Sequence, residues 1–85
     1  MKQKLKRLDQ LCEGEAASLQ EILPVHPLRI RLLDMGWFDG AHVRCIRHAP
    51  WGDPIAYRTA GVTVALRRRD AAMIYVRDTA HREGE

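Results

Sequence analysis

No apolar run in this sequence of 85 residues approaches the roughly 20 residues that a membrane-spanning helix needs, so we expect no membrane insertion. Serine-nucleophile motifs, phosphate-binding loops and dinucleotide-binding glycine motifs are also absent. Without them the chain carries no catalytic signature, and we predict that it is not an enzyme. The amino terminus is basic but lacks the apolar segment of a secretory signal, which predicts a cytoplasmic location.

Cysteine is scarce, with Cys12 and Cys45 alone and no CxxC spacing, so we expect reduced, structural thiols. The only other soft metal ligands are four histidines: His26, His42, His48 and His81. His42, Cys45 and His48 follow one another at intervals of three residues in a predicted strand, which turns neighbouring members to opposite faces. These spacings fit no established ligand set. We therefore predict no cofactor or metal, and keep Cys45, His48 and His42 as candidate ligands for Fe²⁺ or Zn²⁺.

The net charge is only +3, and the basic residues gather at residues 1–7 and at Arg67, Arg68 and Arg69. A single-stranded nucleic-acid binder would interleave aromatic residues with such clusters, and neither cluster has them. We predict no nucleic-acid partner. A weakly binding nucleic-acid barrel stays an alternative, which the salt dependence of binding would test.

The chain is long enough for one small domain, residues 1–85, and too short for two. Alternating apolar residues predict five strands, at residues 15–23, 41–48, 55–59, 62–66 and 74–76. An open sheet of five short strands would leave two edges exposed to pairing. We therefore predict a mainly β fold, a small five-stranded SH3-like barrel with a short helical insertion that plugs one end.

Helical spacing predicts the insertion from Pro27 to Met35, and Gly36 ends it because glycine adopts φ > 0 without a Cβ penalty. Leu5, Leu8 and Leu11 predict a further turn or two of helix. A last single turn is expected after Asp70, which would cap it. Residues 1–7 are predicted to be a flexible basic arm, and residues 78–85 a flexible polar tail.

Three aromatic residues, Trp37, Phe38 and Trp51, fall in predicted turns. They can fold back as lids that bury apolar area over the ends of the barrel, or form an exposed patch for a protein partner. We favour the lid for Trp37 or Phe38 and leave Trp51 open. Arg31 is expected to satisfy nearby carbonyl groups or Asp34 rather than to act in a site.

The order and spacing of many of these residues resemble the FeoA family, small cytoplasmic proteins of bacterial ferrous iron transport. The resemblance rests on Arg31, Leu32, Leu33, Asp34, Met35, Gly36, Asp39, Gly40, Ala49, Pro50, Gly52, Asp53, Pro54, Ala65, Leu66, Arg67, Ala71, Ile74 and Val76. It implies a five-stranded SH3-like barrel, similar also to the carboxy-terminal domain of iron-dependent repressors. It further implies a non-enzymatic accessory protein that modulates FeoB, a membrane permease with a cytosolic GTPase domain, by direct contact.

On this basis we expect the loops to dock on the FeoB-like permease, with Met35, Trp37, Phe38 and Trp51 as apolar contacts. Arg67, Arg68 and Arg69 would steer the domain toward an acidic or phosphate-bearing surface. Self-association through exposed strand edges is a further prediction. A small metal-binding or iron-responsive regulatory module, as in the iron-dependent repressors, stays an alternative function.

Overall fold

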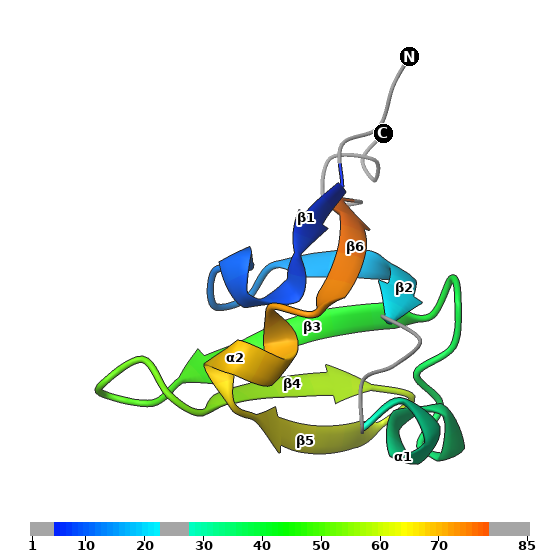
Figure 1. Ribbon diagram of the computed structural model, residues 1–85. Coiled ribbons are helices and arrows are strands. Elements are labelled where there is room, and N and C mark those ends of the chain that lie inside the picture. Colours follow the sequence, from blue (N-terminus) through cyan, green and yellow to red (C-terminus); the bar gives the residue numbers. More distant parts are fainter. Residues whose placement is uncertain (1–4, 23–27, 79–85) are drawn as a thin grey trace.

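The computed structural model of the protein describes residues 5–22 and 28–78. Within them, three short helices punctuate a set of six strands (Figure 1). The strands are β1 (Leu5–Arg7), β2 (Ala16–Ile22), β3 (His42–His48), β4 (Ile55–Thr59), β5 (Val62–Leu66) and β6 (Ile74–Asp78). The helices are the 3₁₀ turn η1 (Leu8–Gln10), α1 (Arg29–Asp34) and α2 (Arg68–Ala71). No helix of this part of the chain is long and apolar enough to cross a membrane.

The strands form one antiparallel sheet in the order β1-β6-β2-β3-β4-β5. Its register shifts in the β2–β6 pair between Leu19 and Glu21, and in the β3–β4 pair between Cys45 and Arg47. Such bulges bend a strand and increase its twist, and Figure 1 shows β1 and β6 crossing the direction of β3, β4 and β5. β1 and β5 stand at the two ends of this order and do not pair with each other, so within the described residues the curled sheet keeps two edges.

One correction concerns the amino terminus, where Leu5 is not helical and residues 5–7 of the predicted flexible arm are ordered, whereas the predicted turn of helix is confirmed as η1 at Leu8–Gln10. Leu5–Arg7 form a strand that pairs with β6, which makes six strands where five were predicted. The pairing is possible because β6 begins at Ile74 and extends to Asp78, two residues beyond the predicted end. Of the predicted flexible tail 78–85, Asp78 belongs to β6, and residues 79–85, like residues 1–4, lie outside the described residues.

The core is built from alternate residues of the central strands, as the period-two pattern predicts. Val43 and Cys45 of β3 and Ile55 and Tyr57 of β4 have almost no exposed area. Leu8 closes one end of this core, where its carbonyl accepts a hydrogen bond from the Tyr57 hydroxyl at 3.2 Å. In the described segments the other buried hydrophobic residues are Leu11, Ala17, Leu19, Leu32, Trp37, Leu66, Ala71, Ile74 and Val76.

Helix α1 ends at a glycine, as predicted. Gly36 has φ of 96°, its N–H binds the Leu33 carbonyl at 3.1 Å, and the Trp37 N–H binds the Leu32 carbonyl at 2.9 Å. This pair of bonds is the Schellman motif, in which the residue after the glycine packs against the last turn of the helix. A Cβ on Gly36 would lie 3.2 Å from the Ala60 Cβ, so the glycine also lets α1 approach the β4–β5 turn.

Helix α2 starts earlier than predicted, and the expected capping role of Asp70 was wrong. Arg67 is the N-cap, and Asp70 lies inside the first turn. The cap comes from another loop, because the Asp53 carboxylate accepts a hydrogen bond from the Arg68 backbone N–H at 2.8 Å. Asp53, which is distant in sequence, therefore caps the helix in place of Asp70, the residue that the local pattern predicted.

Candidate docking interface

Trp37 is fully buried, which confirms the lid and removes it from the predicted contact residues. Its ring meets Tyr57 edge to face, with centroids 6.2 Å apart and an interplanar angle of 90°. The cause is local, since the Schellman motif at Gly36 turns the next residue back onto Leu32. An apolar residue directly after a helix-ending glycine is a sequence signal for this burial.

The exposed apolar side chains of this region lie on the outer side of α1 and in the turn that follows it. Ile30 is 71% exposed, Leu33 38% and Phe38 57%. Our reading of the sequence singled out Phe38 but missed Ile30 and Leu33, although their spacing of three residues places them on one helix face. α1 thus exposes apolar side chains beside its charged residues Arg29, Arg31 and Asp34, whereas an ordinary surface helix exposes mainly polar ones.

A groove of about 240 Å³ separates α1 from β5. Leu28, Leu32 and Met35 line it from the helix side, and Val64 and Leu66 from the strand side. Leu28, Met35 and Val64 are only partly buried, so their apolar atoms are accessible in the groove. Met35, a predicted contact, thus lies in the groove wall.

Three charged residues also line this groove: Arg31, Arg67 and Asp70. Both arginines are exposed, and two positive charges face one negative charge there. Arg31 was expected only to satisfy neighbouring carbonyl groups or Asp34, and its place in the groove is a finding of the structure. The groove therefore combines apolar walls with a net positive rim.

The predicted cluster Arg67, Arg68 and Arg69 is divided by the fold. Arg67 lines the groove and Arg69 is exposed on α2. Arg68 is half-buried and donates from its guanidinium to the Gly52 carbonyl at 3.0 Å. Its Nη1 also lies 3.6 Å from a carboxylate oxygen of the buried Asp9. Arg68 joins three segments of the chain and is not a free steering charge.

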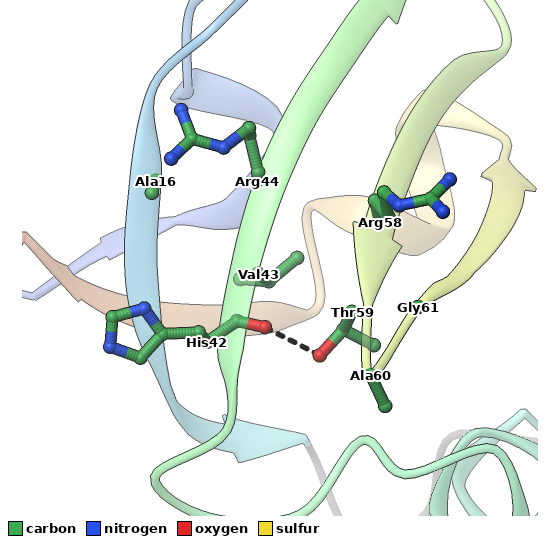
Figure 2. Close-up of a pocket in the computed structure, with 8 residues that line it drawn as sticks. All are labelled: Ala16, His42, Val43, Arg44, Arg58, Thr59, Ala60 and Gly61. Carbon is green, nitrogen blue, oxygen red and sulfur yellow. Dashed lines mark hydrogen bonds between the residues drawn. The ribbon is translucent and has the colours of Figure 1, made fainter.

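A second hollow of about 240 Å³ lies over β3 and β4 (Figure 2). Arg44 and Arg58 stand opposite each other in the strand register, yet Figure 2 shows their guanidinium groups pointing apart. Arg44 donates to the Gly14 carbonyl at 2.6 Å, and Arg58 donates to the Thr63 hydroxyl at 2.7 Å. The Thr59 hydroxyl donates to the His42 carbonyl. These polar groups serve the fold and do not converge on one point.

The candidate metal ligands are dispersed. Cys45 is buried in the core and His42 is exposed on the other face of β3, as the odd spacing predicts. His48 is half-buried, with its Nε2 at 3.2 Å from the Leu11 carbonyl. Burial raises the pKa of the Cys45 thiol, which disfavours the thiolate that a metal needs. Neither cysteine is in a disulfide, and no three histidine, cysteine or acidic residues of the described segments cluster around a common point.

Trp51 is 89% exposed, in the turn that the Gly52 N–H closes onto the Ala49 carbonyl at 2.7 Å. This turn connects β3 and β4, and Figure 1 shows that connection at the opposite end of the molecule from α1. The predicted apolar contacts thus form no single patch. Met35 and Phe38 belong to the α1 end, and Trp51 stands alone at the other.

Comparison with known proteins adds an independent line of evidence. A family model described as FeoA domain matches residues 6–78. A curated protein of Porphyromonas gingivalis, named Fe(2+) transport protein A/Fe(2+) transporter FeoB fusion protein, is 37% identical over 70 residues. This match takes in 82% of the present chain but only 8% of the fusion protein.

Solved structures show the same fold. The solution structure of a FeoA protein from Chlorobium tepidum has a TM-score of 0.83 and 34% identity, covering 93% of this chain and 75% of that one. A crystal structure of Stenotrophomonas maltophilia FeoA complexed with zinc has a TM-score of 0.73 and 26% identity, covering 87% and 91%. It is described as an SH3 domain protein possibly acting as a ferrous iron transport activating factor. The predicted SH3-like architecture is confirmed by this likeness.

Proposed function

The chain belongs to the FeoA family, non-enzymatic accessory proteins of ferrous iron transport, and we propose that it acts in the cytoplasm by docking on the cytosolic part of the FeoB permease. The fusion protein of Porphyromonas gingivalis supports this, because FeoA and FeoB are there parts of one polypeptide. Joining two modules in one chain raises their effective concentration for each other. Docking in this manner would let the domain modulate the GTPase of the permease.

The observation that carries the proposal is the apolar α1 end of the molecule. Ile30 and Phe38 are each more than half exposed. Met35, which lies between them in sequence, lines the groove between α1 and β5. Burying one such side chain against a partner gains about 1.5–3 kcal/mol. A few of them suffice for a specific complex once the cost of association is met. We propose Met35, Phe38, Arg67 and Arg69 as contacts, with Arg67 and Arg69 meeting acidic groups.

Trp51 is a rival anchor at the far end of the domain. Tryptophan is one of the residues enriched among interface hot spots. The α1 end offers Ile30, Leu33 and Phe38 as exposed apolar side chains, whereas the β3–β4 turn offers Trp51. We therefore propose the α1 end as the docking surface.

Co-purification and titration of the full chain with detergent-solubilised FeoB test this proposal. Phe38→Ala is expected to weaken binding about 30-fold, as for a hot-spot residue. Trp51→Ala and the exposed β3 variant Arg47→Ala are the matched controls and should change binding by less than about threefold. If Trp51→Ala abolished binding and Phe38→Ala did not, the docking end would be the opposite one. If the unaltered chain failed to bind FeoB, docking itself would be wrong.

The zinc in the Stenotrophomonas maltophilia structure raises a second function, metal binding. In the present chain the candidate ligands Cys45, His48 and His42 do not face one another. We therefore prefer docking to metal delivery as the function. Stoichiometric, micromolar binding of Fe²⁺ or Zn²⁺ to the reduced chain, lost in Cys45→Ser or His48→Ala, would reverse that preference.

A further inference from the structure

The β4–β5 hairpin determines which backbone groups of β5 point away from the sheet. Its two turn residues, Ala60 and Gly61, have φ of 53° and 78°, the pattern of a two-residue type I′ turn. In such a hairpin the residues that flank the turn, Thr59 and Val62, exchange both hydrogen bonds. Bonding to β4 then alternates along β5, through residues 62, 64 and 66. The N–H and C=O groups of Thr63 and Ala65 consequently point outward, to the edge.

Within its own sequence this edge strand carries none of the features that prevent strands from pairing with other chains. Among the described residues β5 pairs only with β4, and its register runs without a bulge from Val62 to Leu66. The strand reads Val-Thr-Val-Ala-Leu, with no charge, proline or glycine. Natural edge strands are ordinarily blunted by lysine, proline, bulges or shortness. An open edge of five residues is a surface suited to adding a strand.

The groove described above lies alongside this open edge. Ala65 lines it together with its neighbours Val64 and Leu66, and α1 forms the facing wall. A strand added to β5 would lie between the edge and the helix, with alternate side chains directed toward the apolar walls. Backbone hydrogen bonds to Thr63 and Ala65 would provide affinity, and the groove would select the side chain.

Charge indicates the chemistry of the added strand. Arg31 and Arg67 are exposed at the groove, and Asp70 is the only acidic residue in its lining. A segment with carboxylates next to an apolar residue would complement this rim. A second copy of the chain would instead bring its own Arg31 and Arg67 to the same interface, and like charges in register are unfavourable.

We propose that β5 binds an extended, acidic and apolar segment of a partner protein as an added strand, with an apolar side chain in the groove and carboxylates facing Arg31 and Arg67. This inference rests on the proposed function, and the segment it requires belongs to the cytosolic part of FeoB.

Amide hydrogen exchange of the full chain bound to detergent-solubilised FeoB tests the strand addition. Exchange proceeds in the complex, is quenched, and is read residue by residue by NMR on the recovered chain. The amides of Thr63 and Ala65 should slow at least about tenfold on binding, whereas those of Val62 and Val64, already bonded to β4, should change little. Docking on side chains alone would give no such alternation, and its absence in a formed complex would overturn the inference while leaving docking intact.

Two sets of variants test the edge and the charges separately. Ala65→Pro removes the outward N–H and keeps the β4 ladder, so it should weaken binding about tenfold or more, while Ala65→Val keeps the N–H and should bind as the unaltered chain. Melting curves establish that both variants fold. Arg31→Glu and Arg67→Glu should each weaken binding about tenfold, against no change for Arg47→Glu, which alters the net charge equally.

Three further outcomes would overturn the proposal. Equal binding by Ala65→Pro and Ala65→Val would remove the edge from the interface. Protection of Thr63 and Ala65 that grows with concentration in the chain alone would identify a second copy as the occupant. Failure of the unaltered chain to bind FeoB would refute the proposed function and, with it, this segment as the added strand.

Discussion

The two edges of the sheet differ in length, charge and surroundings. β1 has three residues, Leu-Lys-Arg, and its charged side chains are held by ion pairs, Lys6 to Glu15 at 3.8 Å and Arg7 to Asp9 at 3.0 Å. β5 has five residues without a charge and lies beside an apolar groove. A short, charged edge resists further pairing, and a longer uncharged one accepts it. In the part of the chain that the structure describes, the sheet thus has one protected and one open edge, which makes the open one the candidate for a partner.

The largest loss in the free energy of unfolding is expected from Trp37→Ala, on the side of the molecule that carries the open β5 edge. Trp37 is fully buried after α1, which walls the groove, and removal of such an aromatic ring costs about 3–5 kcal/mol in the free energy of unfolding. Urea unfolding followed by circular dichroism measures this cost. Trp51→Ala, at an 89% exposed tryptophan, is the control and should stay within about 0.5 kcal/mol.

A second substitution at Trp37 separates the contribution of ring packing to stability from that of the polar indole N–H. Its indole Nε1 has no hydrogen-bond partner among the described residues. Trp37→Phe keeps an aromatic ring and removes that N–H, so it should cost clearly less than Trp37→Ala. An equal loss in the two variants would contradict the view that packing against Leu32 and Tyr57 is the main contribution.

Loss of a buried charge next to the protected β1 edge should lower the free energy of unfolding. Asp9 is 7% exposed and bridges Arg7 and Arg68, so Asp9→Ala leaves two arginines without their carboxylate. We expect a loss of about 1–3 kcal/mol in the free energy of unfolding. The same urea titration measures it, with the exposed Asp39→Ala as the control, expected near zero. A negligible loss for Asp9→Ala would show that these ion pairs do not hold the β1 edge.

The smallest of these effects concerns the seating of α1 against the β4–β5 turn. Gly36→Ala imposes a Cβ at φ of 96° and 3.2 Å from the Ala60 Cβ, and should cost about 1–2 kcal/mol from the backbone conformation, with a further steric contribution. Gly40→Ala is the matched control, because its φ of 88° is similar but its added Cβ would meet nothing within 4 Å. Equal melting temperatures for the two variants would mean that the close approach to Ala60 contributes nothing.

Much of the fold followed from local pattern. The strand at residues 55–59 and the helix stop at Gly36 were predicted at their observed positions, because alternation and glycine act within a few residues. Strand β1 was not, since Leu5–Arg7 are too short to show a period and depend on pairing with β6. Asp70 was expected to be a cap, and the actual partner of α2 is Asp53, which lies in a loop far from α2 in sequence.

The candidate site was predicted less completely than the fold. Met35, Phe38 and Arg67 were selected from the sequence, and the structure places all three at the α1 end or in its groove. The run Arg67 to Arg69 read as one basic cluster, but successive residues around a helix turn point in different directions. Arg68 consequently turns inward to Gly52 and Asp9.

By itself the sequence determined the family, the mainly β character, the helix stop at Gly36 and the absence of a catalytic motif, because each depends on neighbouring residues or on their order. Only the tertiary structure decided that Trp37 is buried and Phe38 exposed, that Arg68 is structural, and that β5 is an open edge beside a groove. These properties depend on which distant segments pack together, and a strand becomes an edge only when no other strand lies beside it.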